Sequence, residues 1–376
     1  MIKKQKLYYC ILIMSFLSFA TLEINVAYLV GIFTLGAVFF GVLTNKLRLT
    51  KFSVLLSLLG ALLLFGQMLT LFVQAGLVGE NPGRYLGSGN LNFLSILLFV
   101  LCIFFGFASN VVSHALSFNS RISVYRAYSN ALIVFLVIDL MVRLLMFDPS
   151  QGLLYGIKHG IFYYDSNFTG VLILSSIFIF DYLKRIDVFE IGNVKKILLI
   201  LLLLGTFSRA AIAAYLLAAI FIKFKDRLKV IYIALLLTVV FLGFELLMGY
   251  MAGDDILDYD GSFRSKFYIL SLLIDLYPSL PIFLKLFGVG LGNAEQYLGI
   301  FAHNIIVTFV LEFGLFAALG VMAMLFILHH LYRGLFSYTT LPIAIVGFSL
   351  FSAYMPFYFV YIGVLARESQ YVRGAS

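Results

Sequence analysis

The 376-residue chain is 62% hydrophobic and only 12% charged, and it carries a formal net charge of +8. Soluble globular domains are about 45–50% apolar and about 25% charged, so this composition excludes a water-soluble globule and indicates a polytopic membrane protein. Both cysteines, Cys10 and Cys102, lie inside apolar runs, which leaves neither a disulfide framework nor a cysteine-based metal site.

Apolar runs long enough to cross a bilayer recur along the whole chain. In chain order they cover about residues 7–22, 26–43, 52–73, 91–112, 130–147, 167–183, 230–250 and 304–328. Two further runs, 197–222 and 336–366, are too long for one ordinary span. Basic clusters flank the first of them on both sides, and polar residues interrupt its centre, so we expect a broken helix pair with Arg209 at the bend. Tyr354–Pro356 divides the second run in the same way.

Basic residues occupy alternate loops, as the retention of Lys and Arg on the cytoplasmic side requires. Most of them fall in seven clusters: Lys3/Lys4/Lys6, Lys46/Arg48/Lys51, Arg121/Arg126, Lys184/Arg185/Lys195/Lys196, Lys223/Lys225/Arg227/Lys229, Arg333 and Arg367/Arg373. The net charge is therefore an orientation signal, and nucleic acid is not an expected partner. We predict one all-α membrane domain over residues 1–376, with about 10–12 membrane helices, both termini cytoplasmic and a large periplasmic loop at 251–303.

Few ionisable residues lie within the apolar runs, and each is a functional hypothesis. Asp139 and Arg143 are four residues apart and are expected to pair on one helix face. Arg209 has no acid close in sequence, and its planar fork suits phosphate oxygens. A distant carboxylate such as Glu312 is the alternative partner of Arg209.

The large outer loop adds two candidates. Arg264 begins an apolar stretch, Phe267–Leu276, which is typical of a helix lying in the membrane interface. From there Arg264 would reach a phosphate, or simply be solvated. His303 lies where the loop returns to the membrane, and a neutral imidazole there would accept a proton from a sugar hydroxyl, or be structural. The acidic stretch 254–260 lacks the glycine and final glutamate of an EF-hand loop, so it predicts no metal site.

Four ordered motifs resemble the Wzy/WaaL superfamily of O-antigen polymerases and ligases. They are Asp165-Ser-Asn167, Thr206-Phe-Ser-Arg209, Gly261-Ser-Phe-Arg264, and a glycine-rich turn at 287–294 that is followed by Ala-His303-Asn304 and Glu312-Phe-Gly. The resemblance covers about residues 160 to 315. The N-terminal third matches that superfamily only in hydropathy.

The resemblance implies a metal-independent glycosyltransferase of the GT-C type, without a cofactor, in the bacterial inner membrane with its active site facing the periplasm. Its substrates would be undecaprenyl-pyrophosphate-linked glycans, as donor and as acceptor, and a chain-length regulator is a candidate partner. The short chain and modest loop favour a polymerase; the alternatives are a ligase that transfers glycan to lipid A-core, and a polysaccharide flippase or transporter. The implied site comprises His303, Arg209 and Glu312 as catalytic residues, Arg209, Arg264 and Arg143 as pyrophosphate ligands, and Asn167, Asn304 and Asp165 as further site residues.

Overall fold

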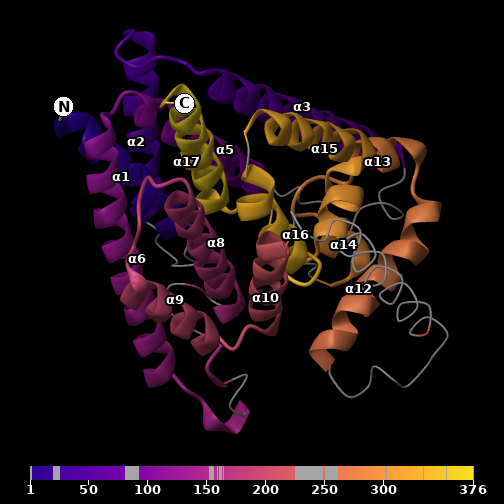
Figure 1. The fold of residues 1–376 in the computed structure, drawn as a ribbon. Helices are drawn as coiled ribbons and strands as arrows, with labels where there is room; N and C mark the ends of the chain where they lie inside the picture. The colour runs from indigo at the N-terminus through magenta and orange to yellow at the C-terminus, as the bar shows by residue number, and fades with distance from the viewer. Residues whose placement is uncertain are drawn as a thin grey trace.

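The computed structural model describes residues 2–19, 26–80, 93–151, 156–158, 160, 163, 165–224, 249, 261–300, 303–332, 334–352 and 354–375. All regular secondary structure in these ranges is helical. Five of the described helices are long and apolar enough to cross a membrane: Val26–Leu43, Lys51–Phe72, Leu94–His114, Phe118–Leu145 and Ser166–Arg185. The prediction of an all-α, polytopic membrane protein is confirmed at this level (Figure 1). The predicted span at 230–250 and the acidic stretch 254–260 lie outside the described residues, apart from residue 249.

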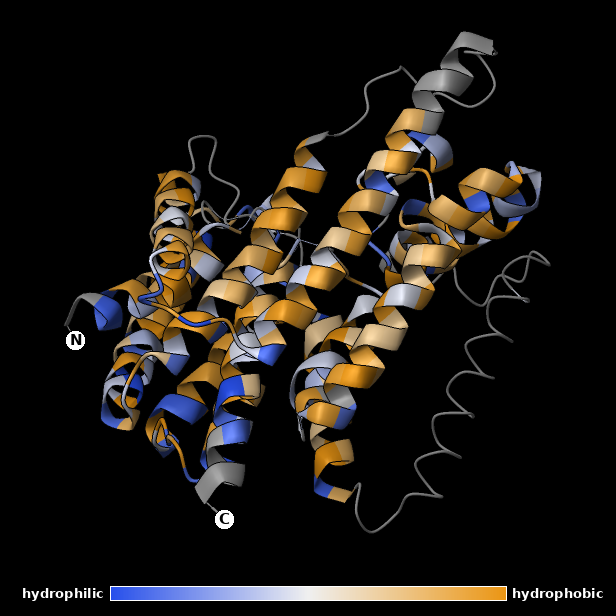
Figure 2. Cartoon of the chain, turned by 90° about the horizontal axis from the view of Figure 1, so that it is seen from above, coloured by the Kyte–Doolittle hydropathy of each residue, from blue (hydrophilic) through white to orange (hydrophobic). Residues whose placement is uncertain are grey.

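The N-terminal half contributes α1 (Ile2–Leu17), α2 (Val26–Leu43), α3 (Lys51–Glu80), α5 (Phe93–His114), α6 (Phe118–Leu145) and α8 (Ser166–Arg185). Their outward faces are apolar: Phe33 and Leu43 of α2 and Phe72 of α3 are each at least 77% exposed. Figure 2 shows the long helices as hydrophobic over most of their length. Apolar side chains exposed on this scale indicate a surface that faces lipid.

The centre of the bundle is the close contact between α5 and α17 (Pro356–Ala375). A Cβ atom on Gly363 would lie 2.7 Å from the backbone oxygen of Gly106, so the two helix backbones touch where each carries a glycine. Asn110 Nδ2 donates to the Gly363 oxygen at 3.1 Å. Small residues and an interhelical hydrogen bond are the usual means by which membrane helices pack.

The predicted broken pair is present as α9 (Asn193–Gly205) and α10 (Arg209–Phe224). Phe207 adopts φ +52° between them, and the Ser208 hydroxyl accepts a hydrogen bond from the Ala211 N–H at 3.4 Å. Ser208 therefore caps α10, which begins at Arg209. The two helices are about 20 and 24 Å long, so each reaches only part of the way across a bilayer.

The run 336–366 is also divided. Within it η5 (Phe336–Thr340) and α16 (Leu341–Gly347) come before a non-helical segment, and α17 begins at Pro356. Proline is favoured at the first turn of a helix because its missing N–H would have no partner there.

The predicted continuous span 304–328 is wrong. A π-helical turn, η4 (Val307–Glu312), is followed by Gly314 at φ +77°, where α15 (Gly314–Leu331) starts in a new direction. The cause is a chain crossing, because a Cβ on Gly314 would lie 2.2 Å from the Gly288 nitrogen. In Figure 1, α15 lies beside α3 and both cross the view, whereas α8 and α10 run up and down it.

The described part of the large loop folds around a second, smaller apolar core. It contains α12 (Gly261–Leu276), η3 (Tyr277–Ser279), α13 (Ile282–Phe287) and α14 (Ala294–Leu298). Ile269 and Leu273 of α12 pack in one cluster with Leu298 and with Leu311 of η4. The predicted interfacial helix at 267–276 is thus the second half of α12.

Several of the basic residues that the structure describes, Lys4 and Lys46 among them, gather at one end of the bundle, here called the basic end. Lys4 Nζ donates to the Lys46 oxygen at 3.3 Å, and the rings of Phe52 and Tyr332 are 5.5 Å apart. Gln370 Nε2 donates to the Tyr332 hydroxyl at 3.3 Å. The N and C labels lie at the same end of the molecule in Figure 1.

Arg121 differs from its predicted place in a cytoplasmic loop. It lies in the first turn of α6, is 1% exposed, and donates from Nε and Nη2 to Glu368 of α17 at 2.6 and 3.1 Å. The Tyr125 hydroxyl donates to the same carboxylate at 2.7 Å. Helix α6 begins at Phe118, well before the predicted span at 130, and Ser117 is its N-cap, accepting the Ser120 N–H.

Candidate functional site

The start of α8 is built by Asp165 and Asn167. One Asp165 oxygen accepts the Asn167 N–H at 2.9 Å, and the other accepts from Asn167 Nδ2 at 3.0 Å. Asp165 is therefore the N-cap of α8, favoured there by its carboxylate at the positive end of the helix. This pair of predicted site residues is locked together.

The first turn of α8 lies against the break between α9 and α10. The Ser166 hydroxyl donates to the Thr206 oxygen at 2.8 Å. A Cβ on Gly170 would lie 3.0 Å from the Ala211 Cβ, so the two helices approach closely there. Arg209, at the start of α10, is thus placed near the start of α8, opposite the basic end. Its side chain is exposed.

Arg143 forms the predicted ion pair with Asp139. Its Nε donates to Asp139 Oδ2 at 2.7 Å, and both groups are buried. Its Nη2 donates to the Tyr163 oxygen and the Thr169 hydroxyl at 2.9 and 3.0 Å, and its Nη1 donates to the Lys158 oxygen. The prediction of Arg143 as a reserve pyrophosphate ligand is not compatible with this geometry, since the guanidinium is 1% exposed and engaged on all three nitrogens. Its role is to hold the backbone of Lys158 and of Tyr163 beside Thr169 of α8.

His303 packs against the first turn of α8. Its ring packs edge-on against Phe168, with centroids 5.0 Å apart, and its backbone oxygen accepts the Phe351 N–H at 3.2 Å. Burial, with a smaller effect of Lys266, lowers the pKa of His303 to about 4, although Asp165 and a backbone hydrogen bond at Phe351 act in the opposite direction. The imidazole is therefore neutral near pH 7, the form that accepts a proton.

Lys266 of α12 is a further candidate that was not predicted from the sequence. Burial lowers the pKa of Lys266, Asp165 raises it, and Lys158 lowers it. Lys266 is thus within electrostatic range of His303, Asp165 and Lys158, which come from three separate segments. Arg264, one turn earlier on α12 than Tyr268, is exposed.

Glu312 organises the glycine-rich loop. Its Oε1 accepts the N–H groups of Gly292 and Ala294 at 3.0 and 3.3 Å, and its backbone oxygen accepts the Gly290 N–H at 3.1 Å. The side chain is 7% exposed. The carboxylate of Glu312 thus binds the backbone of the loop. The alternative predicted from the sequence was an ion pair with Arg209.

Two polar residues of α3 complete this contact and were missed. Gln67 accepts the Leu291 N–H at 2.6 Å and donates to the Glu312 backbone oxygen at 3.3 Å. The Thr70 hydroxyl donates to the Phe287 oxygen at 2.6 Å. The available signal was a pair of polar side chains three residues apart, on one face of an otherwise apolar span.

Asn304 positions its neighbour His303. Its Oδ1 accepts the Ile306 N–H at 2.8 Å, and its Nδ2 donates to the Phe348 oxygen at 2.8 Å. Asn304 is buried and fully engaged. It ties the start of η4 to the segment after α16 rather than facing a ligand.

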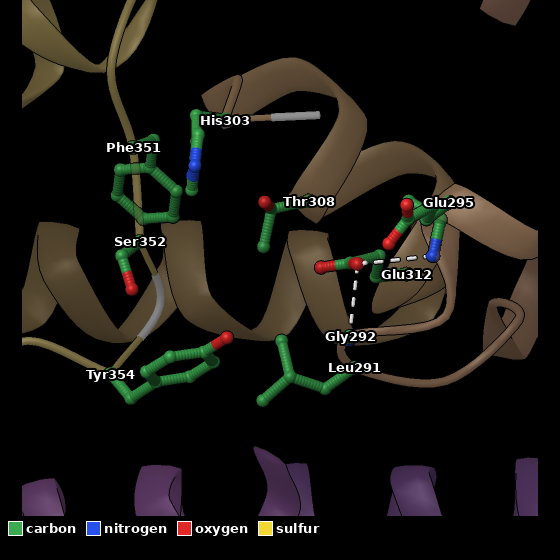
Figure 3. A pocket seen from close by; sticks show the side chains of 10 residues that line it. Leu291, Gly292, Glu295, His303, Thr308, Glu312, Phe351, Ser352 and Tyr354 are labelled. Atoms are coloured by element: carbon green, nitrogen blue, oxygen red, sulfur yellow. Dashed lines mark hydrogen bonds between the residues drawn. The ribbon is translucent and has the colours of Figure 1, made fainter. Parts of the chain in front are cut away.

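His303 and Glu312 line one recess, with an empty volume of about 400 Å³ that includes space open to solvent. Figure 3 shows Glu295 and Glu312 on one side of it, Phe351, Ser352 and Tyr354 on the other, and Thr308 between them. The recess thus combines carboxylates, hydroxyls, aromatic rings and an imidazole. In the described part of the chain, no group of three or more His, Cys, Asp or Glu side chains is arranged to hold a metal ion.

This arrangement provides a neutral proton acceptor in His303 and positive charge in Lys266 and Arg209 that suits an anionic group. The polar recess suits a group that carries hydroxyls. No protein-family model, no curated protein and no solved structure matches the chain.

Proposed function

We propose that this protein polymerises undecaprenyl-pyrophosphate-linked oligosaccharide repeat units into O-antigen polysaccharide. The observation that carries the proposal is the position of His303, which lines a polar recess together with Glu312 and packs against Phe168 at the start of α8. The motifs of the chain also occur in the same order as in the Wzy-type polymerases, which they resemble.

The chemistry is a glycosyl transfer. The oxygen of an acceptor sugar hydroxyl attacks the anomeric carbon of the donor, forming the new C–O bond. The bond between that carbon and the diphosphate oxygen breaks, and its electron pair leaves with the lipid diphosphate. His303 takes the hydroxyl proton.

Cations stabilise the leaving group. Negative charge develops on the diphosphate as the bond breaks, and preorganised positive groups lower the energy of that state. The charge of Lys266 acts on His303. Arg209 is the first residue of α10, and Arg264 lies in the first turn of α12. An arginine fork binds two phosphate oxygens at once, so Arg209 is proposed as the principal ligand.

The arrangement of charge along the bundle supports a periplasmic site in the inner membrane. Lys4, Lys46 and the Phe52–Tyr332 contact lie at the basic end, whereas Asp165, Arg209 and His303 lie at the other. Under the positive-inside rule the basic end is cytoplasmic. The lipid-linked glycan would then reach the site from the outer leaflet.

The test is a deletion strain complemented with variants. Lipopolysaccharide that bears a single repeat unit would support a polymerase, whereas bare core with accumulated lipid-linked polymer would identify a ligase and overturn the proposal. Accumulated single lipid-linked units on the cytoplasmic face would identify a flippase. Arg209→Ala and Arg209→Lys should both lose most polymer at normal protein level, and Arg126→Ala, an exposed arginine outside the site, should retain it.

A further inference from the structure

One wall of the recess is held together by backbone hydrogen bonds. Leu291, Gly292, Ala294 and Glu312 all line the recess, and they are called the recess wall below. Every backbone N–H from residue 289 to residue 294 donates to a partner within hydrogen-bond distance. A loop whose consecutive N–H groups are all bonded has little freedom to move without losing one of them.

Glu312 and the glycine-rich loop fix each other. The backbone oxygen of Glu312 accepts the Gly290 N–H, and its Oε1 accepts the N–H groups of Gly292 and Ala294. A carboxyl group keeps an acceptor oxygen whether or not it is protonated, so this arrangement does not depend on its charge. Figure 3 shows the other side-chain oxygen of Glu312 pointing away from the loop, toward the middle of the recess. The position of the loop therefore sets the direction of Glu312.

One partner of the recess wall comes from a membrane helix. Gln67 of α3 accepts the Leu291 N–H through Oε1 at 2.6 Å and donates from Nε2 to the Glu312 backbone oxygen at 3.3 Å. One turn later on the same helix, the Thr70 hydroxyl donates to the Phe287 oxygen at 2.6 Å. A primary amide has both a donor and an acceptor, and Gln67 uses them on the two segments that form the wall.

Gln67 is an unusual residue for its place in α3. Its side chain is 1% exposed, whereas Phe65 and Phe72 on the same helix are 65% and 80% exposed. Burial of an amide is costly unless its hydrogen bonds are made, and polar groups within membrane helices are most often retained for function. An apolar side chain would fill this position at lower cost, so the contacts with the recess wall are the reason for a glutamine.

We infer that Gln67 is a positioning residue for the site: it fixes the glycine-rich loop, and through the loop it sets the direction of Glu312 beside His303. The inference rests on the proposed function and deepens it. Without Gln67 the buried Leu291 N–H would lose its partner, and the loop would move to recover one. A displacement of about 1 Å in an active site can cost about 10²-fold in rate.

The experiment combines polymer formation in proteoliposomes with amide hydrogen exchange of the loop in the same preparations. Gln67→Met retains the size of the side chain and removes both hydrogen bonds. It should lower kcat by about tenfold or more, leave KM within about twofold, and speed exchange over residues 289–294 by about tenfold or more. Ser109→Ala is the matched control, because it removes a buried hydrogen bond between helices, to the Val360 oxygen, far along the chain from the loop. It should change neither readout.

Two further variants separate positioning from packing. Gln67→Glu retains an acceptor for the Leu291 N–H in either protonation state, so it should keep more activity and slower loop exchange than Gln67→Met. Thr70→Val removes only the bond to Phe287 and nearly preserves volume. It should shift both readouts in the same direction by a smaller factor, and it replaces Gln67→Met as the test if that variant does not accumulate.

A double-mutant comparison tests the route of the effect. In a Glu312→Ala background, adding Gln67→Met should lower kcat by less than about twofold, because the group that Gln67 positions is already gone. A loss by the same factor in both backgrounds would mean that Gln67 acts independently of Glu312, and it would overturn the inference. Wild-type kcat in Gln67→Met would overturn it as well.

Failure of the proposed function gives a different result. Wild-type protein that forms no polymer from lipid-linked repeat units rejects the polymerase, and loop exchange in Gln67→Met then still decides whether α3 fixes the recess wall. Normal polymer formation by both wild type and Gln67→Met rejects only the positioning role of Gln67.

Discussion

At the scale of single residues, the state of His303 is set by its neighbours. Burial and Lys266 disfavour the imidazolium, so its pKa is lowered to about 4. A histidine whose pKa in the folded state lies below its ordinary value binds protons more readily when unfolded. Its contribution therefore lowers stability as pH falls from about 6.5 to about 4.

The same shift predicts the pH dependence of catalysis. The acidic limb of kcat/KM, which reports the free enzyme, should lie near pH 4 rather than near the ordinary value of about 6.5. Lys266→Gln removes a neighbouring positive charge and should move the limb to higher pH. Polymer formation in proteoliposomes, measured across the acidic range, checks both. A limb near pH 6.5 that persists in Glu312→Gln, a change in the same recess, would mean that His303 is not the proton acceptor in this environment.

At the scale of elements, the crossing of the glycine loop over η4 shapes the recess. Gly288 has φ +81°, and a Cβ there would lie 2.2 Å from the Glu312 oxygen. The glycine loop can therefore lie close enough to Glu312 for its N–H groups to reach the carboxylate only if position 288 has no side chain.

Gly288→Ala should therefore destabilise the protein by about 3 kcal/mol or more, because backbone strain adds to a contact with main-chain atoms that cannot move aside. Gly299→Ala is the matched control, since Gly299 also has positive φ, at +69°, but nothing lies within 4 Å of its Cβ position. It should cost only the conformational penalty, about 1–2 kcal/mol. Thermal unfolding of both variants in detergent measures the difference, and equal losses would contradict the crossing.

Local patterns in the sequence predict the elements whose cause is local. The break before Arg209 follows from polar residues inside an apolar run, and the start of α17 follows from Pro356. The turn at Gly314 was not predictable, because it depends on close backbone contact with Gly288, which belongs to another segment. Lys266 was missed for the same reason: nothing on α12 indicates that His303 and Asp165 lie near it.

At the scale of the whole molecule, orientation has a direct test. In a variant without Cys10 and Cys102, Ser279→Cys places a thiol at an exposed turn of the large loop, and Lys46→Cys places one at the basic end. A membrane-impermeant maleimide should label Ser279→Cys in intact spheroplasts and Lys46→Cys only after permeabilisation. The opposite pattern would put the site in the cytoplasm.

The pair of Arg121 and Glu368 has a consequence for how the bundle is made. The two residues are 247 positions apart, so a ribosome delivers the guanidinium long before its carboxylate. Until α17 inserts, Arg121 has to keep contact with water or headgroups, because an isolated buried charge is far too costly. Packing of α6 against the centre of the bundle is thus expected to require prior insertion of α17. Loss of α17 would then impair assembly of the protein in the membrane rather than the chemical step.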